Sequence, residues 1–171
     1  MQQPMKKRTL VILKPEALEN CIVGSVLRFF DRAGLRSVAM KQYKPLDFEM
    51  EQHYKDVIGR VGPIIGKDIV HRMTRGDCIF CVYEGIGSID PVIAARSVVG
   101  ATDPSKADEG TIRHRFGGSV QYNVVHASDS PESAEREIGI WFPHLANKVS
   151  ENNHATNEGD ENLRCFECNG C

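Results

Sequence analysis

Hydrophobic and polar residues follow two different periods along most of this chain. Runs rich in apolar and β-branched residues predict four strands, at residues 8–14, 35–43, 78–83 and 121–126. Between them, apolar residues recur every three or four positions and predict helices at residues 16–33, 47–57, 63–74, 91–99 and 131–141. Gly34 suits the end of the first helix, and Ser130-Pro131 suits the start of the last.

The order of these elements predicts the fold class. Four strands with helices between them are typical of an α/β (α+β) fold with a four-stranded antiparallel sheet, the ferredoxin-like arrangement. We expect helices to cover one side of that sheet. Residues 8–145 then form one domain, after an N-terminal extension at residues 1–7.

Composition narrows the class of protein. The chain has 171 residues, of which 41 % are hydrophobic and 26 % charged, and a formal net charge of −2. A nearly neutral chain that binds polyanions must confine its basic residues to a cleft. No apolar run approaches the ~18 residues of a membrane span, and the first residues lack the apolar core of a secretory signal. The sequence therefore predicts a cytoplasmic protein without a membrane partner.

The C-terminal residues have a different composition. Residues 147–161 contain almost no apolar side chain, so 146–171 is predicted to be a polar, flexible tail. It ends in Cys165, Cys168 and Cys171, whose spacing could support a metal or a disulfide but lacks the second pair of a structural zinc site. Its role stays open. Cys21, Cys78 and Cys81 lie in apolar segments and are predicted to be small buried residues.

His126 is the most informative candidate for chemistry. It ends the fourth predicted strand just before the last predicted helix, and anions bind where backbone N–H groups converge at a helix N-terminus. Neutral imidazole keeps a lone pair on one ring nitrogen and can act as a nucleophile that carries a phosphoryl group. A lone histidine more often simply closes a turn, so the case for a nucleophile depends on the polar residues elsewhere in the chain.

Those residues predict an anion site. Lys14 ends the first strand, and the long segment 101–118 contains Thr102, Arg113 and Arg115. Arg96 lies on the helix that leads into this segment, and Asn123 precedes His126 by three positions. Each of these residues alone could be an ordinary surface group. Together around one histidine they suit a phosphate, because arginine grips phosphate oxygens in pairs and lysine supplies a compact charge.

Over roughly residues 8 to 142, the chain resembles the nucleoside diphosphate kinase family. The resemblance rests on collinear motifs: Asn123-x-x-His126-Ala127-Ser128-Asp129, Gly110-Thr111-Ile112-Arg113, Gly100-Ala101-Thr102-Asp103-Pro104, Lys14-Pro15 and the segment from Glu132 to Phe142. It implies ping-pong transfer of a γ-phosphoryl group from a nucleoside triphosphate to a nucleoside diphosphate.

The resemblance also implies roles for individual residues. His126 attacks through Nδ1 and becomes phosphohistidine, Glu137 orients the ring by accepting a hydrogen bond from the other nitrogen, and Ser128 lies nearby. Tyr54 flanks the phosphorylated ring. The phosphates are held by Lys14, Arg96, Thr102 and Arg113, and the ribose hydroxyls by Asn123. Mg²⁺ bridges phosphate oxygens with few direct protein ligands, and the chain is a homo-oligomer.

The chain departs from the family pattern at three places. Glu16-Ala17 replaces Asp-Gly after Lys14-Pro15, and a polar tail replaces the segment after Phe142 that often makes subunit contacts. The segment after Tyr54 is longer than usual, and Ile64 or Ile65 stands where an aromatic ring stacks on the base. Because ring stacking contributes ~1–3 kcal/mol per base, we expect weaker nucleotide binding without loss of chemistry.

Two other functions were weighed against the kinase. A catalytically weak, nucleotide-binding regulatory module could keep the same fold, since fold does not guarantee activity. A nucleic-acid-binding sheet would need exposed aromatic residues on adjacent strands, and Tyr83 and Tyr122 are too few and lack basic neighbours. The sequence favours the kinase and predicts no specific nucleic-acid partner.

Overall fold

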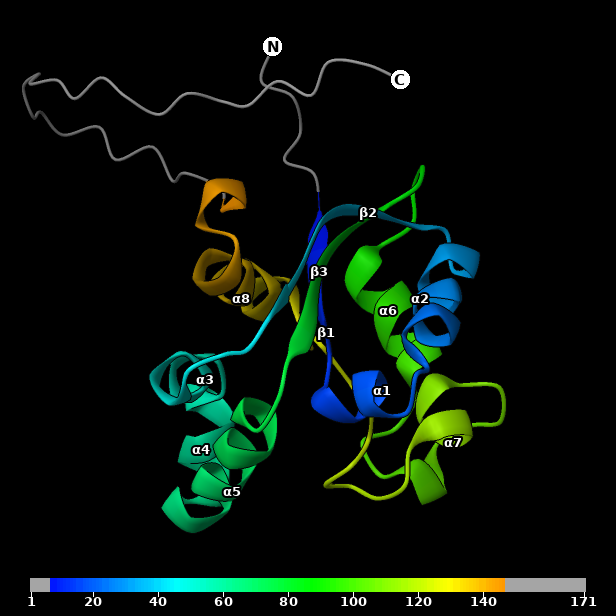
Figure 1. Cartoon of the computed structure of the whole chain (residues 1–171). Coiled ribbons are helices and arrows are strands. Elements are labelled where there is room, and N and C mark those ends of the chain that lie inside the picture. Colours follow the sequence, from blue (N-terminus) through cyan, green and yellow to red (C-terminus); the bar gives the residue numbers. More distant parts are fainter. Residues whose placement is uncertain (1–6, 147–171) are drawn as a thin grey trace, which may run out of the picture.

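A single antiparallel sheet forms the centre of the molecule (Figure 1). The computed structural model describes residues 7–146; the predicted tail with its three cysteines and nearly all of the N-terminal extension lie outside the described residues. The strands are β1 (Arg8–Leu13), β2 (Leu35–Tyr43), β3 (Cys78–Gly85) and β4 (Val125–Ala127), in the order β2-β3-β1-β4. All three neighbouring pairs are antiparallel, which confirms the expected ferredoxin-like sheet.

Helices fill the connections between the strands and also follow the last strand. They are α1 (Pro15–Glu19), α2 (Val23–Arg32), α3 (Asp47–His53), α4 (Lys55–Val61), α5 (Pro63–Thr74), α6 (Pro91–Val99), α7 (Ile112–Phe116) and α8 (Pro131–Trp141), with short 3₁₀ turns η1 (Pro104–Lys106) and η2 (Pro143–Leu145). The predicted start of the last helix is confirmed, because the Ser130 hydroxyl accepts a hydrogen bond from the Ser133 N–H group. None of the helices in the described range is long and apolar enough to cross a membrane.

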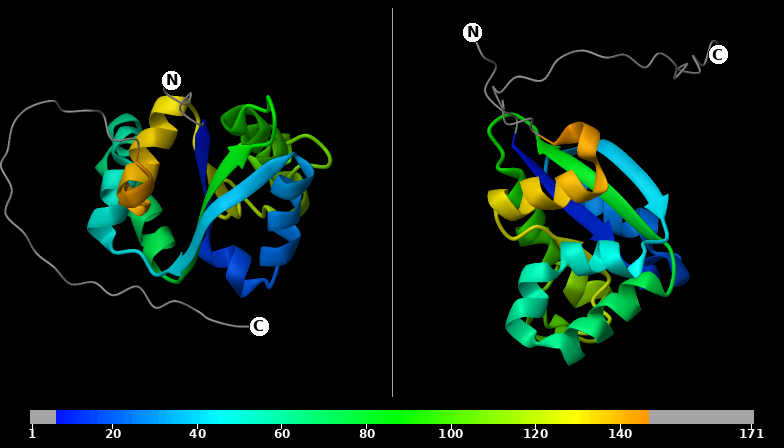
Figure 2. Two further views of the ribbon diagram at one scale, coloured as in Figure 1. Left: turned by 90° about the horizontal axis from the view of Figure 1, so that it is seen from above. Right: turned by 90° about the vertical axis from the view of Figure 1, so that its left-hand side faces the viewer.

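Both faces of the sheet are covered, so the expectation of one covered side was wrong. In β1, Val11 and Leu13 pack into a core with α2 and α6, whereas Leu10 and Ile12 pack into a second core with α3, α5 and α8. Figures 1 and 2 show these two groups of helices on opposite sides of the strands. The physical reason lies in the strand itself, because β1 is apolar at four consecutive positions and needs cover on both faces.

Two predicted helices are each broken into two. The helix expected at residues 16–33 becomes α1 and α2, because Cys21 adopts a left-handed backbone with φ 55° between them. Cys21 is exposed there, contrary to the prediction, whereas Cys78 and Cys81 are buried as expected. The helix expected at residues 47–57 becomes α3 and α4, with Tyr54 as the junction.

The segments around His126 are also more broken than predicted. The expected strand 121–126 is reduced to β4, because Val124 has a φ of 73° that no strand allows. The segment 101–118, expected to be a loop, contains η1 and α7. The chain therefore changes direction repeatedly just before the histidine, and these turns decide which side chains meet it.

Candidate active site

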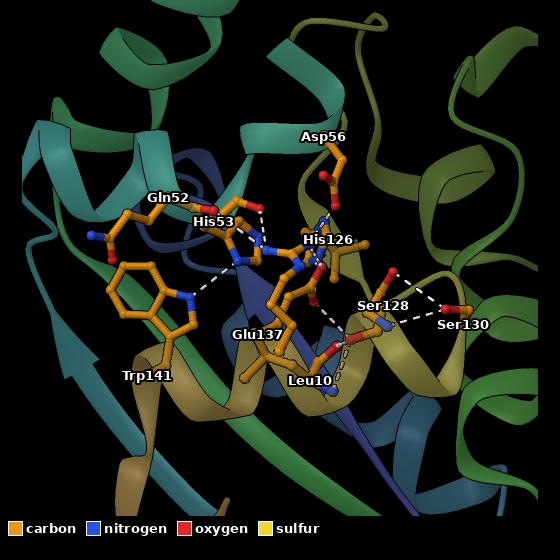
Figure 3. Close-up of polar contacts among 12 residues, drawn as sticks. Leu10, Gln52, His53, Asp56, His126, Ser128, Ser130, Glu137 and Trp141 are labelled. Carbon is orange, nitrogen blue, oxygen red and sulfur yellow. Dashed lines mark hydrogen bonds and ion pairs between the residues drawn. The ribbon is translucent and has the colours of Figure 1, made fainter. Parts of the chain in front are cut away.

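His126 lies in the middle of β4, opposite Ile12 of the central strand β1. Its Nε2 atom is 3.0 Å from Oε2 of Glu137, which belongs to α8 (Figure 3). The Ser128 hydroxyl donates to the same carboxylate oxygen at 2.7 Å. Both supporting residues are buried, and the histidine side chain keeps 18 % of its surface exposed. The ring is thus fixed on one edge and open on the other.

The protonation of Glu137 decides which ring nitrogen of His126 is free. Burial by itself would raise the pKa of this carboxyl, but the neighbouring His126 and the hydrogen bonds from His126 and Ser128 outweigh burial and hold the pKa well below its usual range. An ionised carboxylate accepts hydrogen bonds and donates none. Nε2 must therefore carry the proton, and Nδ1 of a neutral ring keeps its lone pair for reaction.

A second histidine packs against the first. The rings of His53 and His126 meet edge to face with centroids 4.6 Å apart. Burial, together with the charge of His126, lowers the pKa of His53 to about 3, so His53 is neutral. Its Nδ1 accepts a hydrogen bond from the Trp141 indole at 3.1 Å (Figure 3). His53 was not predicted from the sequence, and it packs against His126 from the side of α3.

Tyr54 completes the packing around the ring. Its ring centroid lies 5.7 Å from that of His126 at an angle of 80°. Burial raises the pKa of the phenol, with a further contribution from Glu137, so Tyr54 stays a neutral donor at working pH. This agrees with the predicted place of Tyr54 beside the reactive ring.

Two connected hollows open beside His126. The larger is a cleft of about 460 Å³, and six predicted site residues line it: Lys14, Tyr54, Thr102, Arg113, Asn123 and His126. The smaller, of about 160 Å³, brings Arg96 to the same histidine, and Arg113 lines both hollows. Glu137 also lines the smaller hollow, whereas Ser128 lines neither. Arg115, also considered from the sequence, instead stacks on Phe116 and is exposed.

Lys14 and Asn123 form the floor of the cleft. The Lys14 ammonium donates to the Asn123 side-chain oxygen at 2.6 Å, and the Asn123 amide nitrogen donates to the Thr102 carbonyl at 3.0 Å. Burial lowers the pKa of Lys14 to about 8, as does the nearby charge of Arg113, against the opposing effect of Glu16. The lysine is therefore a poorly hydrated cation, which an entering anion stabilises.

Arg113 is held by the backbone of two segments. Its guanidinium donates to the carbonyls of Gly100, at 3.1 Å, and Val125, at 2.8 Å. Burial lowers its pKa to about 10, with a contribution from the charge of Arg96. The Nε–H group is buried without a hydrogen-bond partner. A buried cation with an unused donor is stable when an anion completes its bonds.

The residue between Asn123 and the strand is strained. Val124 has a φ of 73°, rare for a β-branched residue, and a bond from the Val125 N–H to the Asn123 carbonyl closes a γ-turn around it. The Glu16 carboxylate accepts the Val124 N–H at 3.1 Å, and the Lys14 N–H donates to the Val124 carbonyl at 2.9 Å. The residues after the first strand thus fix the turn that places Asn123 and His126.

Part of the cleft is lined by aliphatic residues. Val61 belongs to α4, Ile65 to α5 and Val120 to the segment between α7 and β4. Ile65 is 52 % exposed and lines the cleft, whereas Ile64 is 85 % exposed and does not. Of the two isoleucines that the sequence offered for the position beside the base, the structure therefore selects Ile65.

Several polar residues of the two hollows were missed from the sequence. They are His53, Arg60 and Arg136 in the smaller hollow and Asp68 and Arg72 in the cleft. Arg136 lies 3.7 Å from the second oxygen of Glu137 and donates to the His53 carbonyl. A polar pair at positions four apart on one helix was the available signal for Asp68 and Arg72, and nothing in the sequence singled out the others.

Comparisons of this chain with a family model, with curated proteins and with solved structures all match nucleoside diphosphate kinases. The family model described as nucleoside diphosphate kinase matches residues 7–146. Curated nucleoside diphosphate kinases from Nocardioides and Saccharopolyspora erythraea are 46 % and 43 % identical over 142 residues, which is 82 % of this chain and 100 % of each relative. Among solved structures, the apo nucleoside diphosphate kinase of Encephalitozoon cuniculi has a TM-score of 0.75 at 31 % identity, covering 84 % of this chain and 94 % of that chain. The Aquifex aeolicus enzyme has a TM-score of 0.73 at 33 % identity, with coverages of 82 % and 97 %.

Proposed function

The chain belongs to the nucleoside diphosphate kinase family and is a phosphotransferase, and on that premise we propose that it works by a ping-pong mechanism through a phosphohistidine at His126. One observation carries the choice of nucleophile. His126 lines both hollows while its Nε2 edge is bound to Glu137, so the Nδ1 lone pair is the reactive one.

The proposed chemistry is balanced over two half-reactions. In the first, Nδ1 of His126 forms a bond to the γ-phosphorus, the bond to the bridging oxygen breaks, and its electron pair leaves with the nucleoside diphosphate. The ring becomes positively charged, and the Glu137 carboxylate stabilises it through the Nε2–H group. In the second half-reaction, a terminal phosphate oxygen of another nucleoside diphosphate attacks the same phosphorus and Nδ1 leaves.

In this proposal, the cationic side chains that line the two hollows bind the phosphates of the nucleotide. We assign Lys14, Arg96, Arg113 and the Thr102 hydroxyl to the phosphate oxygens and Asn123 to the ribose hydroxyls. Lys14 and Arg113 are supported by burial, because a partly desolvated cation binds an anion more strongly than a hydrated one. Phosphoryl transfer depends chiefly on alignment and charge neutralisation, which these groups supply without moving far.

Enzymes of this family need a divalent metal, and we propose that it is Mg²⁺, held by the phosphates of the nucleotide. Mg²⁺ takes oxygen ligands and keeps several waters. The described cleft is lined by two carboxylates, of which Glu16 accepts the Val124 N–H group and Asp68 pairs with Arg72, and we assign neither to the metal. The group His53, His126 and Glu137 brings potential ligand atoms within 4.8 Å, but two of its three ligands are imidazoles and do not suit Mg²⁺. When bound on the nucleotide, the ion neutralises phosphate charge.

The alternatives weighed from the sequence are not favoured. A catalytically weak module would be expected to lack part of the phosphate-binding set, and the predicted set lines the two hollows. Tyr83 is buried in the core, so no aromatic platform for nucleic acid is available at that strand. We also propose a homo-oligomer and a cytoplasmic location. Strand β2 supports the oligomer, because within residues 7–146 it is a nine-residue edge strand with one neighbour, and mass measurement in solution tests it.

Incubation with ATP labelled in the γ-phosphate tests the mechanism. We expect one label per chain that is labile in acid and stable in base, as phosphohistidine is, and that leaves on addition of any nucleoside diphosphate. Label that resists acid, or label that a nucleoside diphosphate cannot remove, would contradict a phosphohistidine intermediate.

A further inference from the structure

An ion pair on α5 lines the same cleft as His126. Ile65, Asp68, Ile69 and Arg72 follow one another at helical spacing on α5 and line one wall of the cleft. Asp68 and Arg72 bind each other through a carboxylate oxygen and a guanidinium nitrogen. Phosphoryl transfer as proposed above uses neither of them.

The proposed position of the nucleotide determines which part of it meets this pair, and so the inference rests on the proposed function. With the phosphates at His126 and the ribose at Asn123, the base reaches the aliphatic walls of Ile65 and Val120. Asp68 lies one helical turn beyond Ile65 on the same face of α5. A base whose face lies on Ile65 therefore presents an edge to Asp68.

The geometry points to guanine as the preferred base, read by the carboxylate of Asp68. An ionised carboxylate offers two acceptor oxygens side by side and no donor. Guanine presents two adjacent donors on one edge, the N1–H and the 2-amino group, which match those two oxygens. Adenine and cytosine place an acceptor nitrogen beside their amino group, and uracil and thymine flank their single N–H with carbonyls. Only guanine satisfies both carboxylate oxygens.

Arg72 acts as a positioning residue for this carboxylate. Its side chain is 17 % exposed, whereas that of Asp68 is 56 % exposed. The less exposed arginine lines the cleft and holds the more exposed acid beside it. A single guanidinium contact leaves acceptor capacity on the carboxylate, since a carboxylate has about four lone-pair sites.

Equilibrium binding gives the direct test. Titration calorimetry with GDP and ADP, on the wild-type chain and on Asp68→Asn, measures the ratio of the two dissociation constants. We expect GDP to bind about tenfold more tightly than ADP, the lower part of the range for a bidentate contact to a base. In Asp68→Asn the ratio should fall to about one, because an amide offers one acceptor instead of two.

Glu51→Gln is the matched control. Glu51 lies on α3, is exposed, and lines a separate surface hollow with Lys55 and Lys67. The substitution removes one negative charge, as Asp68→Asn does, so the GDP-to-ADP ratio should stay at the wild-type value. An Arg72→Gln variant should lower the ratio only in part, since the carboxylate remains but is less well held.

Two results would overturn the preference: equal binding of GDP and ADP by the wild-type chain, or an unchanged ratio in Asp68→Asn. Neither result touches the phosphohistidine, because the label experiment on the same proteins reports His126 chemistry separately. Conversely, a guanine preference in binding without any acid-labile label would support the role of Asp68 and contradict the proposed transfer.

Discussion

The two ends of the cleft are built in opposite ways. At the histidine end, polar side chains are buried and tied to one another: Asn123 is 2 % exposed and Arg113 5 % exposed, and both make hydrogen bonds to backbone carbonyls. At the base end, Val61, Ile65 and Val120 are 38 %, 52 % and 48 % exposed. The histidine end therefore consists of buried, hydrogen-bonded polar groups. The other end, which we call the rim, consists of the partly exposed aliphatic side chains of Val61, Ile65 and Val120.

This difference separates what the chemistry needs from what binding needs. Electrostatic stabilisation of a transition state depends on donors that are already in place, because reorganising them would cost free energy at the moment of reaction. Covering the face of a base requires only apolar surface in roughly the right place. We therefore expect substitutions at the histidine end to act on rate and those at the rim to act on affinity.

Loss of the nucleophile should have the largest effect. His126→Ala should abolish phosphate exchange and acid-labile labelling while nucleotide binding, measured by calorimetry, stays largely intact. The exposed His114 of α7 gives the control, and His114→Ala should label like the wild type. Turnover that survives in His126→Ala would refute the covalent role.

Loss of the Glu137 carboxylate, which binds the His126 ring, should have the second largest effect on activity. Glu137→Gln should lower kcat by about 10- to 100-fold, as does loss of carboxylates that orient metal-bound imidazoles, because an amide can favour the wrong tautomer of His126. Glu109→Gln makes the same change at an exposed position outside the two hollows and should be nearly silent. An equal loss in both variants would count against a specific role for Glu137.

Glu137 should also affect stability at low pH. Its pKa in the folded state is held below the unfolded value, so its contribution to the free energy of unfolding is present above about pH 4.3 and disappears as the pH falls toward 2. Urea unfolding at pH 7 and pH 3 measures this. The wild-type chain should lose more stability than Glu137→Gln over that interval.

The lowered pKa of Lys14 predicts a decline of activity at high pH, which is a basic limb in the pH profile of kcat/KM. Lys14 has a pKa of about 8 in the free protein, so kcat/KM should decline above about pH 8 as the ammonium loses its proton. Bound phosphates favour the charged form, and kcat should therefore decline at a higher pH than kcat/KM. Lys14→Arg should move the limb upward, and a limb that stays in place would assign it to another group.

The smallest effect is expected at the rim. Ile65→Phe should tighten nucleotide binding by about 1 kcal/mol, roughly fivefold in Kd, because a ring can stack on the base. Ile64→Phe is the matched control, since Ile64 is 85 % exposed and lies outside the cleft. Equal affinities in wild type and Ile65→Phe would mean that the base does not rest on this residue.

Local patterns in the sequence determined much of this protein. The apolar run at residues 10–13, the cap at Ser130 and the collinear polar motifs were enough to predict the first strand, the last helix and several of the residues that line the two hollows. These features depend on neighbours in the chain or on residue types that phosphate chemistry requires, so they can be recognised before folding is considered.

Only the tertiary structure decided the rest. The second covered face of the sheet, the γ-turn at Val124 and the choice of Ile65 over Ile64 depend on groups distant in sequence. The free Nδ1 of His126 likewise depends on Glu137 being buried beside it. A strained backbone and a defined tautomer persist because contacts from several elements stabilise them together, and no local period in the sequence records such contacts.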